Sequence, residues 1–298
     1  KTALVHRGAE EISQYYRGLG NVDNPDLAVY ELHLASMSEI DVRGYLIPGE
    51  DGTARFTTPV FAEFVKRHPR GVLFLDEFPQ ATHEVQKAVA PLLLEGRIGD
   101  YQLPGGWMVA LAGNRQEDNS GANNILAHVI NRICYIEVSA PEIDDWVSWA
   151  AAADLSHEAI AFAKVRPEVV FASKAPEADD APYCTPRSLH LLDKVAKRWP
   201  GGLQGMASDN SGHAVIQGFI GRGAMAEMVG FLKTAAEVPS YEAVVADPVG
   251  VVLPTAPDQQ YAALMLVALR AQLSDAGAVV TYLTRFTPNF TIVGLIAL

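Results

Sequence analysis

Two adjacent carboxylates at the end of an apolar run are the most informative residues in this sequence. The run Gly71–Leu75 has no polar interruption, and Asp76 and Glu77 follow it directly. An aspartate in this position could hold Mg²⁺ through its shell of waters, and an adjacent glutamate could polarise a water for attack on a phosphate. The alternative is that two acidic residues simply end a strand and are solvated. These residues alone do not decide between the two interpretations.

Lys1 and Thr2 open an amphipathic segment and match the last two positions of the phosphate-binding pattern G-x-x-x-x-G-K-[ST]. In that pattern the lysine ammonium contacts the β- and γ-phosphates, and the hydroxyl coordinates Mg²⁺. The glycines, whose backbone N–H groups would surround the phosphates, are not in this sequence. Two residues alone are weak evidence for a phosphate-binding site. What supports that interpretation is their position, one helix and one strand before Asp76. The abrupt start without a methionine leads us to expect that residues upstream of Lys1 are missing.

Three further polar residues stand where they could act on a transferred phosphoryl group. Asn114 follows the apolar run Trp107–Ala112. If that run lies beside the strand before Glu77, the Asn114 amide could orient the attacking water. Arg132 precedes another apolar run and Arg187 starts a predicted helix, where arginines can neutralise charge on a phosphoryl group. Taken one at a time, a turn asparagine and two surface arginines are the commoner explanations.

Helices and strands alternate along the first half of the sequence. Three runs that are wholly or mostly apolar are predicted to be buried strands, because near-continuous hydrophobicity is typical of a strand covered on both faces: Gly71–Leu75, Trp107–Ala112 and Cys134–Val138. Residue spacing also predicts a helix over 2–16, a strand over 27–34, a hairpin over 45–56, and helices over 60–67 and 82–94. This alternation predicts an α/β fold with a doubly wound parallel sheet.

The character of the sequence changes after Pro141. Alanine-rich segments, an acidic proline-rich loop and a further amphipathic stretch predict a separate helical domain over residues 141–235. From Val238 onward prolines recur between short helical segments, which predicts a C-terminal helical extension over residues 236–298. The α/β core then comprises residues 1–140.

Composition limits the class of protein. The 298 residues include 23 Lys and Arg against 35 Asp and Glu, for a formal net charge of −12, and 49% are hydrophobic. These values exclude a disordered or collagen-like chain. The acidic balance argues against nucleic acid as the main partner, because binding phosphates requires a concentrated basic face.

Cysteine and histidine usage excludes other classes. Only Cys134 and Cys184 are present, which rules out a disulfide scaffold and favours a reducing compartment, and we expect both to be buried apolar residues. The eight histidines include no pair at ligand spacing, so a zinc protease is not expected. No apolar run is long enough to cross a bilayer and the start is unlike a signal peptide, so we expect a cytoplasmic protein.

The order of the chemistry-bearing residues resembles that of AAA+ ATPases, and within them the MoxR branch. The series is Lys1-Thr2, Asp76-Glu77, Asn114, Arg132 and Arg187. Further similarity to MoxR proteins lies in Asp41–Tyr45, in the stretch Gly52–Phe61 and in Leu92–Ile98. The resemblance covers about residues 1–235.

This resemblance implies a nucleotide site in the core. Lys1 and Thr2 look like the end of a Walker A loop, and Leu73–Glu77 looks like Walker B. Thr2 and Asp76 would then hold Mg²⁺, and Glu77 would be the catalytic base. Asn114 looks like sensor 1.

The same resemblance assigns roles to the two arginines. Arg132 looks like an arginine finger offered to a neighbouring subunit, with Asn131-Arg132-Ile133 in place of the more usual Asp-Arg-Phe. Arg187 looks like sensor 2, carried on a helical lid over residues 141–235.

The resemblance further implies a three-layer αβα P-loop NTPase sandwich that binds ATP and Mg²⁺ and assembles into a homo-oligomer, which we expect to be a hexameric ring. Its activity would be ATP hydrolysis coupled to chaperone-like remodelling of a protein client, often with a von Willebrand A-type partner. Two alternatives stay open. The absent glycines favour a non-hydrolysing nucleotide-binding scaffold, and other AAA+ branches are DNA-directed motors, although basic clusters are sparse here.

Overall fold

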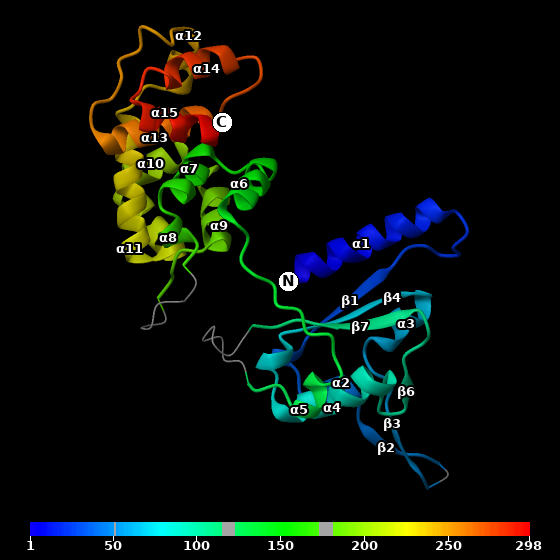
Figure 1. The fold of residues 1–298 in the computed structure, drawn as a ribbon. Helices are drawn as coiled ribbons and strands as arrows, with labels where there is room; N and C mark the ends of the chain where they lie inside the picture. Colours follow the sequence, from blue (N-terminus) through cyan, green and yellow to red (C-terminus); the bar gives the residue numbers. More distant parts are fainter. Residues whose placement is uncertain (51, 115–122, 173–180) are drawn as a thin grey trace. The chain divides into compact units, whose positions relative to one another are not determined.

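The computed structural model describes residues 1–50, 52–114, 123–172 and 181–298. The chain divides into two compact units, Lys1–Glu137 and Val138–Leu298. The first is an α/β unit with a parallel sheet and the second is mostly helical (Figure 1). The α/β class with a parallel sheet is therefore confirmed for the N-terminal part. The division into 1–140, 141–235 and 236–298 stays a prediction.

The first unit alternates helices and strands. In chain order its elements are α1 (Thr2–Leu19), β1 (Ala28–His33), η1 (Leu34–Ser36), α2 (Glu39–Arg43), β2 (Leu46–Pro48), β3 (Ala54–Phe56), α3 (Ala62–Arg67), β4 (Gly71–Asp76), η2 (Phe78–Gln80), α4 (His83–Glu95), β5 (Arg97–Ile98), β6 (Tyr101–Gln102), β7 (Trp107–Leu111) and α5 (Ala127–Ile130). The predicted hairpin is present, because β2 pairs antiparallel with β3.

The central sheet is parallel, with strand order β1-β4-β7. His33 of β1 lies opposite Asp76 of β4, and Leu75 lies opposite Leu111 of β7, so the carboxyl ends of all three strands meet at one edge. Residues 71–75 are buried throughout, as their unbroken hydrophobicity predicted. This edge is where an open α/β sheet collects functional side chains.

Helices cover both faces of this sheet (Figure 1). Leu73 and Leu75 pack in one apolar cluster with Val85 and Val89 of α4. Successive side chains of a strand point to opposite faces, so Asp76 stands on the other face, which α1 covers. The start of α1 and the acidic end of β4 are thereby brought to the same side of the sheet.

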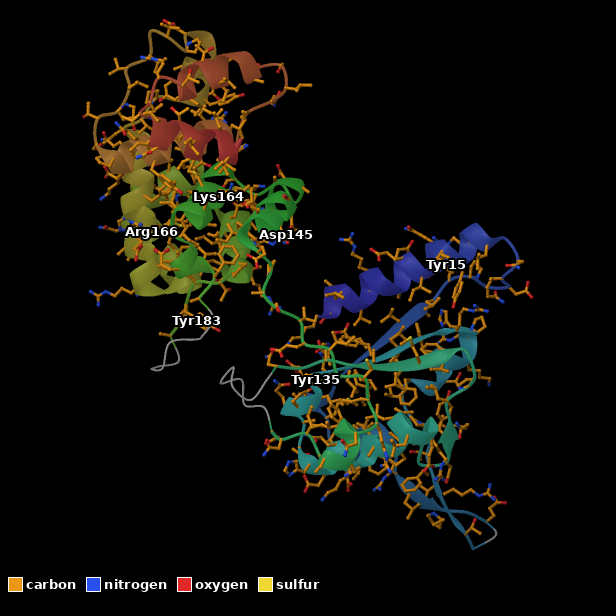
Figure 2. All side chains as sticks on the ribbon, in the orientation of Figure 1. Tyr15, Tyr135, Asp145, Lys164, Arg166 and Tyr183 are labelled. Atoms are coloured by element: carbon orange, nitrogen blue, oxygen red, sulfur yellow. The ribbon has the colours of Figure 1, made fainter. Side chains whose placement is uncertain are left out.

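The prediction of a third buried strand at Cys134–Val138 is wrong. No strand forms there, and Tyr135 and Ile136 are 59% and 75% exposed. Figure 2 shows the position of Tyr135. An extended segment becomes a strand only when a neighbour satisfies its backbone N–H and C=O groups, and none of the described strands pairs with it. The third strand of the sheet is instead β1. Cys134 is accordingly exposed, against expectation, whereas Cys184 is buried as expected.

The second unit consists of helices in its described part. They are α6 (Ile143–Ala152), α7 (His157–Val165), α8 (Pro167–Val170), α9 (Pro186–Ala196), α10 (Gly202–Ala207), α11 (Asn210–Ala236), α12 (Tyr241–Ala246), α13 (Pro257–Ala268), α14 (Ala276–Leu283) and α15 (Pro288–Ala297). Helix α13 belongs to two apolar clusters: Ala262 and Met265 pack with the preceding helices, and Leu264 and Val267 pack with α12 and α14. None of the helices described in either unit is long and apolar enough to cross a membrane.

A buried carboxylate joins α7 to α9 within the second unit. Asp193 is 1% exposed and accepts hydrogen bonds from the backbone N–H of Ser156, at 3.2 Å, and from the Ser156 hydroxyl. Lys197 Nζ lies 3.7 Å from its other oxygen. A buried charge persists only when it is paired in this way, so these contacts fix the start of α7 against α9.

We expect iodoacetamide at about pH 8 to alkylate Cys134 and to leave Cys184 unmodified in the folded protein. Cys134 is exposed, whereas burial raises the pKa of the Cys184 thiol to about 12, so almost no reactive thiolate forms there. Timed labelling followed by peptide mass spectrometry measures both rates. Unfolding in urea is the control and should make the rates equal. Equally fast labelling of both cysteines in the folded protein would contradict the burial of Cys184.

Candidate functional site

The first turn of α1 contacts the carboxyl end of β4. The Thr2 hydroxyl donates a hydrogen bond to Asp76 Oδ2 at 2.8 Å, although the two residues lie 74 positions apart. The other oxygen, Oδ1, accepts from the backbone N–H of Glu77 at 2.9 Å. Both oxygens of this half-buried carboxylate thus have a donor, which fixes its orientation.

Lys1 contacts the end of the neighbouring strand. Its ammonium donates to Asn114 Oδ1 at 2.6 Å and also to the carbonyl oxygen of Gly113. Lys1 and Asn114 are both exposed. The structure therefore brings together Lys1, Thr2, Asp76 and Asn114 from three separate stretches of the chain.

The ends of β4 and β7 are joined beyond the last ladder pair. The Ala112 N–H donates to the Leu75 carbonyl at 3.0 Å, and the Phe78 N–H donates to the Ala112 carbonyl at 2.9 Å. Gly113 then passes so close to Pro79 that a Cβ at Gly113 would lie 2.0 Å from Pro79 Cδ. Only glycine fits there without a shift, and this approach sets where the chain delivers Asn114.

Glu77 adopts a left-handed backbone conformation, with φ 58° and ψ 31°, directly after the strand. Such a conformation costs about 1–2 kcal/mol for a residue with a side chain. Its carbonyl accepts hydrogen bonds from the N–H groups of Gln80, at 3.0 Å, and Ala81, at 3.2 Å, so the turn into η2 is held in place. Glu77 is exposed beside Asp76, and its role as a base stays a prediction.

The two predicted arginines lie outside this group of contacts. Arg132 is exposed just after α5, and no hydrogen bond or ion pair among the described residues joins it to Lys1, Thr2, Asp76 or Asn114. These contacts do not test the predicted roles of Arg132 and Arg187.

Arg187 belongs to the second unit and is exposed at the second residue of α9. A capping box fixes this helix start: the Thr185 hydroxyl accepts from the Ser188 N–H at 3.0 Å, and the Ser188 hydroxyl accepts from the Thr185 N–H at 2.8 Å. Arg187 lines a depression with Tyr183, Pro186 and Phe219.

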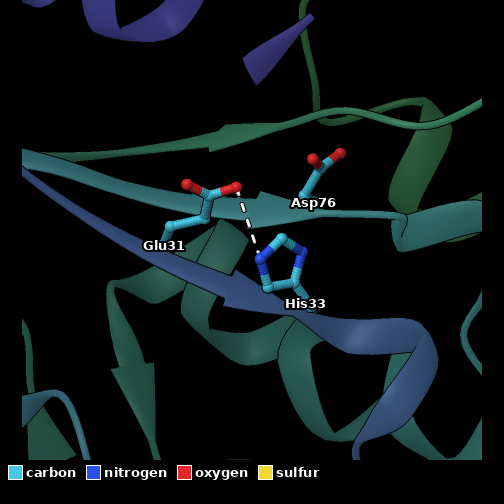
Figure 3. A group of neighbouring side chains, drawn as sticks. All are labelled: Glu31, His33 and Asp76. Atoms are coloured by element: carbon cyan, nitrogen blue, oxygen red, sulfur yellow. Dashed lines mark ion pairs between the residues drawn. The ribbon is translucent and has the colours of Figure 1, made fainter. Parts of the chain in front are cut away.

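Sequence analysis missed two polar residues of this edge, Glu31 and His33. They lie two positions apart on β1 and therefore on one face, beside Asp76 of the paired strand (Figure 3). Glu31 forms ion-pair contacts of 3.5 Å with His33 and with His6 of α1. The spacing Glu31-x-His33 within a predicted strand indicates that the two side chains share one face. Only the pairing of β1 with β4 shows that Asp76 lies beside them.

No family model matches the chain, and no curated protein matches it. The assignment to AAA+ proteins therefore rests on the resemblance of the quoted residues.

We expect Gly113→Ala to destabilise the first unit by about 1–3 kcal/mol, because the new methyl group overlaps Pro79 and the strand end must shift. Gly105→Ala is the matched control: it lies in the loop before β7, meets nothing within 4 Å, and should change stability by at most about 0.5 kcal/mol. Denaturant-dependent hydrogen exchange of peptides covering β4 and β7 measures both. Similar effects of the two substitutions would show that the contact with Pro79 is not a constraint.

Proposed function

We propose that this protein is an oligomeric, MoxR-like AAA+ ATPase that couples ATP hydrolysis to the remodelling of a protein client. The observation that supports this most is the convergence of Lys1, Thr2, Asp76 and Asn114 through the contacts Lys1–Asn114, at 2.6 Å, and Thr2–Asp76, at 2.8 Å. The resemblance requires these residue types at one place, and the two contacts join positions that lie 113 and 74 residues apart in the sequence.

The donor set fits a nucleotide and its metal ion. A lysine ammonium matches phosphate oxygens, and a hydroxyl with a carboxylate offers the hard oxygen ligands that Mg²⁺ prefers. Thr2 and Asp76 already lie within hydrogen-bond distance, so both can face one ion or its waters. Bound Mg²⁺ would neutralise charge on the β- and γ-phosphates.

The chain's own residues then divide the work. Lys1 binds phosphate oxygens, and Thr2 and Asp76 hold the metal side of the site. Glu77, exposed at the strand end, polarises the attacking water, and Asn114 orients it with its amide. Because the ammonium of Lys1 now contacts Asn114, a phosphate bound at Lys1 would lie next to the residue that positions the water.

The arginines provide the dependence on assembly. Arg132 is exposed, as a residue must be to reach the site of a neighbouring subunit in a hexameric ring. An arginine supplied in this way stabilises charge at the moment of transfer. Arg187, exposed at the start of α9, would act as sensor 2 from the helical lid. Lid motion would perform work on the client, together with a von Willebrand A-type partner.

At the level of fold, we propose a P-loop NTPase sandwich of three layers. Helix α1, the parallel sheet β1-β4-β7 and the helix α4 correspond to the layers that this fold requires. The start of α1 beside the end of β4 supports the assignment, because these are the two places that carry Walker A and Walker B residues.

The first test is Glu77→Gln in the full-length protein. We expect steady-state ATP hydrolysis to fall at least about 100-fold, because the amide cannot accept a proton, while binding of a fluorescent ATP analogue persists. Glu95→Gln, an exposed glutamate paired with Arg97, is the control and should retain the parental rate.

Each other outcome of that test is informative. Parental turnover by Glu77→Gln would overturn the assignment of the base. A parental protein that binds ATP without hydrolysing it would be a scaffold rather than an enzyme. Turnover that depends on added DNA would identify a DNA-directed motor.

The second test mixes two inactive variants. Arg132→Ala should lower turnover about 10³-fold or more, whereas Arg67→Ala, another exposed arginine of the same unit, should not. Mixing Arg132→Ala with Glu77→Gln subunits should restore part of the rate, because some interfaces then combine an intact Arg132 with an intact Glu77. Light scattering reports assembly. No recovery from co-assembled subunits would exclude action of Arg132 between subunits.

A further inference from the structure

Three side chains with metal-binding atoms converge on the α1 face of the sheet. In the parallel register of β1 and β4, His33 lies opposite Asp76, and Glu31 precedes His33 by two residues on the same face. One imidazole nitrogen and one oxygen from each carboxylate lie within 4.8 Å of one another (Figure 3). Three ligands from two paired strands form a rigid set, since the backbone ladder fixes their spacing.

The separations suit a shared transition-metal ion. His33 Nε2 lies 3.5 Å from Glu31 Oε1. Ligand atoms bound to one tetrahedral Zn²⁺ at about 2.0–2.1 Å lie about 3.4 Å apart. The imidazole and this carboxylate therefore need almost no movement to bind the same ion. The Asp76 oxygen lies within 4.8 Å of both ligand atoms.

Neighbouring residues support the three ligands. His6 Nε2 of α1 lies 3.5 Å from Glu31 Oε2, the oxygen that does not face His33. This contact restrains the orientation of the Glu31 carboxylate. Outer partners of this kind orient metal ligands and strengthen binding. Asp76 accepts one hydrogen bond at each oxygen, from Thr2 and Glu77, which leaves lone pairs for an ion.

We propose that Glu31, His33 and Asp76 bind one divalent transition-metal ion, with Zn²⁺ the best match and water in the remaining position. Imidazole with carboxylates suits such ions, whereas Mg²⁺ prefers oxygen ligands alone. This metal site is distinct from the proposed nucleotide site, and the two share only Asp76. Binding of the metal ion needs no nucleotide.

The test is Zn²⁺ titration of the nucleotide-free, full-length protein by calorimetry, in excess Mg²⁺ to fill weak oxygen sites on the acidic surface. We expect one tight site per chain. His33→Gln and Glu31→Gln should each weaken it at least about tenfold. His128→Gln, an exposed histidine of the same unit, is the matched control and should leave it unchanged. Glu31 is partly exposed and His33 is exposed, so neither substitution should disturb the core. Circular dichroism verifies that both variants are folded.

Co²⁺ absorption provides a second readout, because visible bands report imidazole and carboxylate ligation, and a thiolate charge-transfer band reports cysteine. Bands lost in His33→Gln support the site. The proposal is overturned if the parental protein binds no Zn²⁺ in excess Mg²⁺, if His33→Gln binds as tightly as the parent, or if the thiolate band identifies Cys134 as the ligand.

The two proposals fail separately. Glu77→Gln removes the proposed base but none of the three metal ligands, so it should retain Zn²⁺ binding whether or not the parent hydrolyses ATP. Retained Zn²⁺ binding without ATPase activity would overturn only the proposed function, and ATPase activity without Zn²⁺ binding would overturn only the metal site.

Discussion

A single hydrogen bond, from the Thr2 hydroxyl to the Asp76 carboxylate, connects the first turn of α1 to the carboxyl end of β4. It orders an oxygen that is already half-buried and places the start of the helix against the sheet edge. Lys1, one residue earlier, then reaches the end of β7. The candidate site depends on this contact, because it sets the position of the start of α1 against Asp76, while the packing of α1 on β4 holds the rest of the helix.

Parallel pairing makes the sheet edge a place where polar groups collect. All strands of a parallel sheet end on the same side, and the buried interior of β4 forces its polar residues to the end of the strand. His33 of β1 lies opposite Asp76 in the register, and the turn after β7 approaches the segment that follows Asp76, where Gly113 passes close to Pro79. One carboxylate consequently stands at the junction of the proposed nucleotide and metal sites.

In the second unit, hydrogen bonds fix the start of α9, the helix that carries Arg187. The buried carboxylate of Asp193 ties α9 to the start of α7, and the capping box of Thr185 and Ser188 fixes the beginning of α9. Arg187 follows this capped start directly. A residue on such a short, doubly fixed segment has little backbone freedom, which suits a side chain that must act at a defined place.

The sequence by itself determined those helices and strands whose own residue pattern shows which side chains are buried. The unbroken run before Asp76 could only be a buried strand, and the helical spacing after Thr2 predicted most of α1. The tertiary structure alone decided the rest. Cys134–Val138 is mostly apolar but contains Glu137 and lacks a described partner strand. Glu31 and His33 become neighbours of Asp76 only through strand register. Pairing between distant strands depends on backbone hydrogen bonds that side-chain periodicity does not encode, so the sequence predicted the strand but not its neighbours.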